Sequence, residues 1–567
     1  MLGHSSVRPL LGLSSVLALG ALAAQTGEEG VPVGFETVYF DEADRSGRLS
    51  GGRTLLPAAV DPESIAPTPA PWVTLTAGAG LAQRGSGGDN RVDLVFVGDG
   101  YTAAEQITFQ THVDDIVAGL FSTEPLGRYA DYFAVHRIEV VSNESGVDND
   151  PIDGIDRDTA LGMSYWCNGI ERLLCVNVGA AYSFANNAPD VDQVIALANS
   201  TKYGGAGYTT SNLATSSGGN GAAVEIVKHE LGHSLGKLAD EYTYGGPTTY
   251  VGGEPNRANV STYDAATMAG LGAKWASWLG ASAAGFDGVI DTYEGGSYSE
   301  LGIYRPSNDS LMRSLNRPFN LVGAEEVIRE LYREVRPIDA SSDPAAAYSD
   351  ADVLFVQPMA VAGTPHSVQW FLNGAPIAGA TGTTLDLASL GLGGCIAEVS
   401  VTVRDETPWV RDEDLRDASM TQSISFTVNG TWVSPSCATT PNSVGSGAVL
   451  DAGGSPSIAD ADLRLGVFGG PPAASALFFY GDTPVSQPLG EGTLCVSGVT
   501  QRLGVTSFDA LGIAGWTLDW SAPPVGAGPN AILPGSTWIF QAWYRDAGAG
   551  GTATFDFSSA VSVRFCP

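Results

Sequence analysis

The chain has 567 residues, of which 44% are hydrophobic and 16% charged, and its formal net charge is −34. This composition indicates globular domains, and the length suffices for roughly three or four of them. Binding to nucleic acid needs a basic face, so the acidity argues against that class of partner. It also disfavours docking on anionic membranes.

An apolar stretch over residues 9–22 follows a modest basic flank and ends in small residues. This pattern is typical of a secretory signal peptide, predicted here over residues 1–24, and it indicates an extracellular or periplasmic protein. The stretch is short for a membrane anchor, and no other segment offers the roughly 20 apolar residues of a span. We therefore expect a secreted protein with no membrane span.

Residues 25–90 are rich in Gly and Pro and include an extended-looking segment, 34–40. They are predicted to form a small N-terminal β-rich module or a pro-region. A pro-segment could block a metal site, but no cysteine lies here to act as the blocking ligand.

Strand-like and helix-like runs alternate in the next region, which we place at residues 91–338. Strands are expected over 92–97, 133–142 and 194–198, and a helix over 103–121. Such alternation predicts an α/β domain.

The most informative segment of that region reads H-E-L-G-H and contains His229, Glu230 and His233. Two histidines four apart on a helix project from one face and can hold one zinc ion, while the glutamate can take a proton from a zinc-bound water. An apolar stripe lies about 140–180° from both imidazoles, so we expect them to face a cleft. That stripe comprises Val224, Val227, Leu231 and Leu235. The alternative is an exposed amphipathic helix with two solvated histidines.

A catalytic zinc ion needs a third protein ligand and one open position. Gly236 tolerates positive φ and is predicted to end the helix, so that the chain turns back under the metal. The extended form of the motif has a histidine where this chain has Ala239. Asp240 is the favoured third ligand and Glu241 the runner-up, although either acid could instead orient a histidine N–H.

A methionine, Met312, lies far downstream, just before a helix predicted over residues 323–335. A methionine turn beneath the zinc is the metzincin arrangement, whereas the alternative is an ordinary core methionine. After an extended H-E-x-x-H motif we favour the turn. Tyr242 is a candidate for stabilising an oxyanion.

Together these residues resemble the secreted IgA-peptidase family of zinc metallopeptidases, a metzincin-like group, over about residues 90–337. The matching runs are 229–242 and 304–320, which are specific, and 93–102, 142–147, 203–207 and 254–256, which are supportive. The resemblance implies a zinc endopeptidase that acts on a protein or peptide, without implying that the substrate is immunoglobulin. It also implies that an edge strand before the zinc helix, about 206–213, pairs with the substrate backbone.

The six cysteines of an exported chain indicate disulfides. Cys167 with Cys175 is a plausible local pair. At least one pair is expected among Cys437, Cys495 and Cys566, while Cys395 is either free or paired with Cys437.

An acidic run could hold a structural calcium ion, in addition to the zinc. It comprises Asp148, Asp150, Asp153, Asp156 and Asp158. The spacing does not match the EF-hand loop, so a solvated acidic loop is the default interpretation.

The character of the chain changes after a linker-like stretch at 343–347. Short alternating strands and an Asn373-Gly374 hairpin signal predict an immunoglobulin-like β-sandwich over 346–430, followed by an all-β domain over 436–567. Four aromatics of the last domain could line a carbohydrate site, but they are more often core. They are Trp516, Trp520, Trp538 and Trp543.

The sequence thus predicts a multidomain protein with an α/β metzincin-like catalytic domain and two β domains. The favoured function is a secreted zinc endopeptidase with Glu230 as general base. The alternative is a non-catalytic adhesin or glycan-binding protein with a structural metal site. A structural site has no need of a base, so the intact Glu230 favours catalysis.

Overall fold

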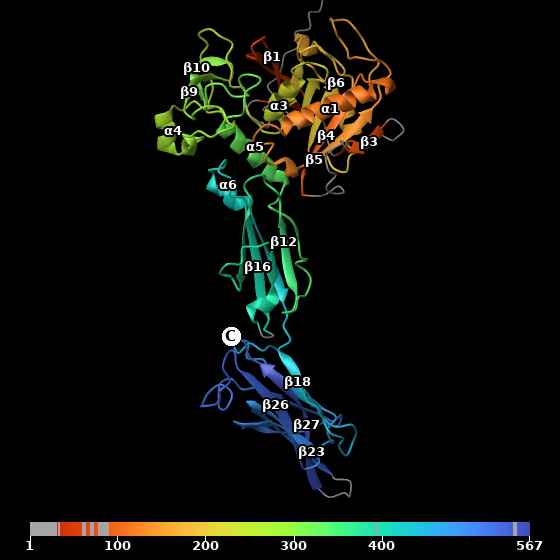
Figure 1. Ribbon diagram of the computed structural model, residues 1–567, viewed down its shortest axis with the longest axis vertical. Coiled ribbons are helices and arrows are strands. Elements are labelled where there is room, and N and C mark those ends of the chain that lie inside the picture. The colour runs from red at the N-terminus through yellow and green to blue at the C-terminus, as the bar shows by residue number, and fades with distance from the viewer. Residues whose placement is uncertain are drawn as a thin grey trace, which may run out of the picture. The chain divides into compact units, whose positions relative to one another are not determined.

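The computed structural model describes residues 31, 34–58, 64–68, 73–77, 90–392, 395–547 and 553–566. The predicted signal peptide lies outside them. The chain divides into two compact units (Figure 1). Unit 1 runs to Val335 and includes 361–363 and 408–413, and unit 2 holds the remainder from Arg336 onward.

Unit 1 is built on an eight-stranded mixed sheet with strand order β2-β1-β7-β8-β6-β4-β5-β3. The four strands β8, β6, β4 and β5 run parallel, and the other pairings are antiparallel. The strands are β1 (Phe35–Ala43), β2 (Leu49–Pro57), β3 (Val73–Ala77), β4 (Val92–Asp99), β5 (Phe133–Val140), β6 (Gln193–Ala198), β7 (Gly205–Tyr208) and β8 (Leu213–Ser217).

The central strands β4 and β6 are buried along their whole length, as expected of apolar parallel strands that are covered on both faces. On one face, Val95 and Val97 of β4 share a core cluster with Tyr182 of α2 (Val178–Ala185). The helices α1 (Gln106–Leu120) and α3 (Ala223–Ser234) pack against each other, and α3 also contacts β7 and β8 (Figure 1). The sheet edge that carries β7 therefore lies beside the helix with the H-E-L-G-H segment.

The predicted helices of unit 1 are present with small shifts at their ends. The helix expected over 103–121 begins as a 3-10 turn, Ala103–Glu105, and continues as α1. The helix expected over 323–335 is α5 (Leu321–Glu334). It starts earlier because the side chain of Asn320 accepts the N–H of Gly323 at 2.8 Å, which caps the first turn. The remaining α-helix and strands of unit 1 are α4 (Ala265–Leu271), β9 (Tyr293–Gly296) and β10 (Ser299–Arg305), and a short helix, α6 (Glu413–Ala418), begins where the chain enters unit 2 for the last time.

The described part of the 25–90 stretch is not separate from this sheet. Strands β1 and β2 form an antiparallel hairpin, and β1 pairs with β7. On the far side of the sheet, β3 pairs with β5. The N-terminal region thus contributes strands to both edges of the sheet.

Unit 2 contains two β cores. The first lies between a sheet of order β11-β12-β15 and a sheet of order β14-β13-β16-β17. Its strands are β11 (Ile338–Ser341), β12 (Val353–Pro358), β13 (Ser367–Leu372), β14 (Ala375–Pro376), β15 (Thr384–Asp386), β16 (Ala397–Arg404) and β17 (Thr421–Val428). Asn373 and Gly374 join β13 to β14 with φ of 49° and 77°, which is the hairpin that their sequence predicts.

The second core of unit 2 is covered by a five-stranded sheet of order β18-β27-β26-β21-β24 and by the smaller sheets β19-β20-β25 and β22-β23. The strands are β18 (Val433–Cys437), β19 (Val449–Gly453), β20 (Arg464–Phe468), β21 (Ser475–Gly481), β22 (Thr483–Leu489), β23 (Gly492–Ser497), β24 (Gln501–Ser507), β25 (Ile513–Thr517), β26 (Thr537–Ala547) and β27 (Ala553–Arg564). All four tryptophans considered above pack against buried clusters of this core.

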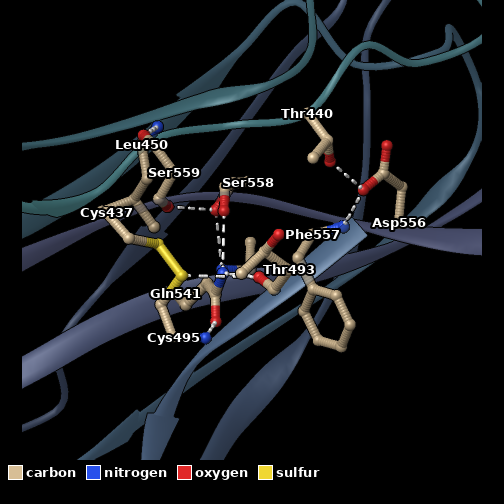
Figure 2. Close-up of a disulfide and its surroundings, with 11 residues drawn as sticks. Cys437, Thr440, Leu450, Thr493, Cys495, Gln541, Asp556, Phe557, Ser558 and Ser559 are labelled. Atoms are coloured by element: carbon tan, nitrogen blue, oxygen red, sulfur yellow. Dashed lines mark hydrogen bonds between the residues drawn. A yellow bond between two sulfur atoms is a disulfide. The ribbon is translucent and has the colours of Figure 1, made fainter. Parts of the chain in front are cut away.

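Three disulfides join the six cysteines. Cys167 pairs with Cys175, as predicted, and Cys437 pairs with Cys495. Figure 2 shows the latter pair beside Gln541, whose side chain accepts the N–H of Cys495 at 2.9 Å and donates to the carbonyl of Thr493. The prediction for Cys395 was wrong: it is neither free nor bound to Cys437 but pairs with Cys566, 171 positions away. Sequence spacing carries no information about such a distant pair.

The protein is therefore multidomain and rich in β-structure, with few helices. Within the described ranges, no helix is both long enough and apolar enough to cross a bilayer.

Candidate metal centre

Helix α3 brings His229, Glu230 and His233 together in the interior of unit 1, where each is at most 1% exposed. The expectation that the imidazoles face an open cleft was wrong. The helix is buried on all sides from Ile226 to Ser234, because β1 and β7 cover the histidine face.

The turn that follows α3 differs from the predicted one. Lys237 adopts the left-handed conformation, with φ of 51°, while Gly236 does not. The N–H of Leu238 then bonds to the carbonyl of Gly232 at 2.8 Å, which closes the helix end. Gly236 is needed for another reason: a Cβ there would lie 2.9 Å from Val327 of α5.

Two backbone carbonyls fix the orientation of the imidazoles. Nδ1 of His229 lies 3.0 Å from the carbonyl of Leu311, and Nδ1 of His233 lies 2.9 Å from that of Leu238. A carbonyl oxygen only accepts, so each Nδ1 carries a proton, and each Nε2 presents a lone pair when its ring is neutral. The two Nε2 atoms face each other at 3.0 Å, an arrangement that calls for a cation between them.

Two carboxylates complete the cluster. Oδ1 of Asp240 lies 3.3 Å from both Nε2 atoms, and Oδ2 of Asp41, from β1, lies 2.6 Å from Nε2 of His229. All four ligand atoms lie within 4.8 Å of one another and are buried. Tetrahedral zinc with bonds of about 2.0–2.1 Å separates its ligands by about 3.3 Å, which is close to most of these distances.

Unpaired buried atoms show that these residues fit a metal ion. Oδ2 of Asp41 and Oδ1 of Asp240 make no hydrogen bond of normal geometry, although a buried carboxylate oxygen usually does, and both lie close to a histidine Nε2. Burial lowers the pKa of His229, but the carboxylate of Asp41 outweighs that effect, and the pKa is raised well above its ordinary value. Burial opposes ionisation of Asp240, yet His233 and His229 hold its pKa below the ordinary value. The site thus favours a positive charge at the point where the four atoms converge.

Glu241, the alternative ligand, lies elsewhere. Its carboxylate accepts from Asn259 at 2.9 Å, from Ser310 at 2.7 Å and from Asn320 at 3.0 Å. Its N–H donates to the carbonyl of Met312 at 2.8 Å. Glu241 therefore ties the segment after α3 to the methionine turn and to the start of α5, and Asp240 is the acid that reaches the cluster.

Met312 lies beneath α3, as the turn interpretation requires. A Cβ on Gly232 would be 2.4 Å from its sulfur, so the glycine between the two histidines is what admits the methionine. The preceding residue, Leu311, supplies the carbonyl that orients His229. The turn supports the cluster through both its side chain and its backbone.

Tyr242 is close to the cluster, but its hydroxyl is engaged: it donates to Oδ1 of Asp41 at 2.6 Å. A second tyrosine, Tyr298, donates to Oδ2 of Asp240 at 2.6 Å. Each acid therefore keeps one oxygen bound to a tyrosine and turns the other toward the histidines.

Glu230 lies between the cluster and β7. Its Oε2 has no hydrogen-bond partner, and a Cβ on Gly207 of β7 would lie 3.0 Å from that atom. Burial, reinforced by Asp41, raises the pKa of Glu230 well above its ordinary range. The carboxyl group of Glu230 thus has one unpaired oxygen beside the cluster and a raised affinity for a proton.

The acidic run near Asp148 forms no comparable cluster. Among the described residues, the one group of three or more potential ligands that converge is that of Asp41, His229, His233 and Asp240. The Asp148 carboxylate accepts the N–H of Arg157 at 2.6 Å, and that of Asp158 accepts from Asn143 at 2.9 Å. The calcium ion remains a prediction.

Sequence reasoning missed Asp41, Tyr298 and the three residues that hold Glu241. Asp41 reaches the histidines because β1 pairs with β7, a strand far along the sequence. No local spacing in the sequence encodes such a contact. The one available signal was the extended segment 34–40 that leads directly into this acid.

Residues 81–285 match the profile of the family described as IgA Peptidase M64, a family of metallopeptidases. A search of curated proteins returned no match. Among solved structures, the chain is similar to a tetra-tandem repeat in the extending region of a large adhesion protein, and to a structure concerned with host cell surface retention of a 1.5-MDa bacterial ice-binding adhesin. Each is 12% identical over 40% of this chain with a TM-score of 0.13, and the chain covers 48% of the first and 63% of the second. At that TM-score the likeness carries no argument.

Proposed function

We propose that the protein is a secreted zinc endopeptidase with a metzincin-like catalytic domain, because residues 81–285 match the profile of the IgA Peptidase M64 family of metallopeptidases. The observation that carries the proposal is the convergence of two Nε2 lone pairs and an unpaired carboxylate oxygen of Asp240 beside the unpaired Oε2 of Glu230. The first three atoms suit a metal, and the fourth suits a base.

In this proposal His229, His233 and Asp240 hold Zn²⁺. When bound, the ion would supply Lewis acidity that polarises the scissile carbonyl and lowers the pKa of water to about 7. Glu230 takes the proton of the attacking water and delivers it to the leaving amine. The carbonyls of Leu311 and Leu238 keep both imidazoles in the tautomer that presents Nε2.

In this proposal β7, which now lies between β1 and β8, becomes the substrate edge when β1 leaves it, in keeping with the expected 206–213 segment. It lies beside Glu230, and Gly207 allows β7 and α3 to approach closely: a Cβ on Gly207 would be 2.8 Å from Cβ of His233. An extended peptide that pairs with this edge would bring its carbonyl to the metal position. Tyr242 would then stabilise the oxyanion once its hydroxyl is no longer bound to Asp41.

The test combines zinc content with cleavage of denatured casein, with and without a chelator. We expect about one zinc per chain, cleavage that stops on chelation, and recovery when zinc is restored. Because Asp41 lies at the cluster, the assay includes Asp41→Asn beside the wild type. Zinc-bound protein that leaves casein intact in both forms, while binding glycans regardless of chelator, would instead support the adhesin alternative.

A further inference from the structure

One residue of the metal cluster comes from outside the 81–285 family match. Asp41 lies on β1, is 2% exposed, and directs its unpaired Oδ2 at His229. With Asp41 present, the cluster offers four ligands, which fill a tetrahedral zinc site. Peptide hydrolysis needs the fourth position for water. If all four residues stay bound, no position is left for the water that Glu230 would deprotonate. Catalysis therefore requires one of the four ligands to leave the metal.

Of the four ligands, Asp41 is the one whose place in the fold allows it to move away from the metal position. The two histidines are fixed on α3. Asp240 follows directly after Ala239, whose backbone N–H and carbonyl both bond to the side chain of Asn259 at 2.8 Å. Asp41 belongs to a hairpin that forms an outer edge of the sheet.

The same hairpin covers the substrate edge. Strand β1 pairs antiparallel with β7, with Val38 opposite Tyr208 and Tyr39 opposite Gly207. The ring of Tyr39 stacks on the imidazole of His233, with centroids 4.1 Å apart and planes 9° apart. An extended substrate that added to β7 would need the positions now held by β1.

A small number of contacts hold the β1–β2 hairpin in place over the cluster. Gly51 of β2 lies opposite Asp41, and a Cβ at that position would be 2.7 Å from the hydroxyl of Tyr242, so the glycine opens the path by which Tyr242 reaches Asp41. At the hairpin turn, the carbonyl of Gly47 accepts the N–H of Leu315 at 2.8 Å. These contacts tie the hairpin to the segment after α3 and to the segment after Met312.

We propose that the N-terminal hairpin, β1 and β2, is an autoinhibitory latch, in which Asp41 takes the metal position that water needs and β1 occupies the substrate edge of β7. This inference rests on the proposed function. Activation requires the hairpin to leave β7, and it frees the metal position and the Tyr242 hydroxyl together. The competing interpretation is that Asp41 is a permanent fourth ligand of a structural site.

The experiment measures zinc content and the affinity of acetohydroxamate, a small chelating probe that needs an open metal position, by calorimetry on the full chain. Asp41→Asn keeps the volume and an acceptor for Tyr242 but removes the anionic ligand. Gly51→Ala changes no ligand, but its Cβ would lie 2.1 Å from the carbonyl oxygen of Phe40 and 2.7 Å from Cα of Asp41, so it forces β1 to shift at Asp41; it serves if the first variant does not fold. The matched control is Glu42→Gln, which removes the exposed carboxylate of the next residue of β1 and its ion pair with Arg172 at 2.7 Å, a surface contact that contributes little stability, and leaves the cluster unchanged.

We expect Asp41→Asn and Gly51→Ala to keep one zinc and to bind acetohydroxamate at least about tenfold more tightly than the wild type, because the open state is a minor fraction of the wild type. Glu42→Gln should match the wild type. Peptidase activity should rise in Gly51→Ala, in which β7 is also uncovered.

Unchanged hydroxamate affinity in zinc-bound Asp41→Asn would overturn the latch. Loss of zinc from that variant would also overturn it, since Asp41 would then be a permanent ligand. Neither result would bear on the role of Glu230 as the base or on the family match. Absence of zinc from the wild type as well would instead defeat the proposed function, and the latch with it.

Discussion

Gly232 is the position at which the packing of the metal helix can be tested most sharply. In an exposed helix, Gly→Ala stabilises by about 1 kcal/mol. Here the new Cβ would lie 2.4 Å from the sulfur of Met312, more than 1 Å inside normal contact. Met312 is 1% exposed and is confined by Leu238, Leu311 and Phe319. Overpacking of this kind costs about 1–3 kcal/mol, so we expect Gly232→Ala to be destabilising despite the helix propensity.

The assay is hydrogen exchange followed by mass spectrometry, because peptides from α3 can be read separately from those of unit 2. In a Met312→Ala background the clash is absent and the new methyl group fills part of the cavity, so the same substitution should become stabilising. Exchange protection of α3 that is equal or greater in Gly232→Ala than in the wild type would refute the reasoning. An identical effect of the substitution in both backgrounds would refute it as well.

Three further outcomes follow from the site and its surroundings. Glu241→Gln places an amide N–H₂ against the donors of Asn259, Ser310 and Asn320, which now bond to the carboxylate. The affinity for zinc, measured in a competition titration, should therefore fall about 10–100-fold. An unchanged affinity would contradict the supporting role of Glu241. Burial raises the pKa of Asp192 to about 7, so the wild type loses stability as pH rises from about 4 through 7. Asp192→Asn should therefore melt at a higher temperature than the wild type at pH 8 and at the same temperature at pH 4. A constant difference across that range would contradict the assignment. Chelation should raise hydrogen exchange in α3 and leave exchange in the β-sheets of unit 2 unchanged. If free zinc stands at 100 times its dissociation constant before chelation, the local stability of α3 should fall by about 2.7 kcal/mol. Exchange that chelation leaves unchanged in α3 would show that no metal is bound there.

The parts of the fold that follow from local pattern were predictable from sequence. The apolar runs of β4 and β6, the Asn373-Gly374 hairpin and the H-E-L-G-H helix all depend on neighbours within a few residues. The predicted acid Asp240 reaches the histidines because it follows the helix by a short turn.

The parts that failed depend on contacts between distant segments. The stripe on α3 indicated an open histidine face, but β1 returns from far upstream to cover it. Gly236 was read as a positive-φ residue, whereas the approach of Val327 from α5 is what requires glycine there. The same holds for Cys395 with Cys566 and for Asp41 with His229, because local propensity does not encode which remote partner fills a site.

The central claim is that Glu230 acts as the base beside a zinc ion held by His229, His233 and Asp240. Its most direct test is kcat/KM of Glu230→Gln, measured with zinc content in both the wild type and the Asp41→Asn background. The account predicts one zinc per chain and a loss of at least about 10²–10⁴-fold in whichever background is active. Glu230→Gln protein that cleaves peptide at the parent rate with zinc in place would contradict it.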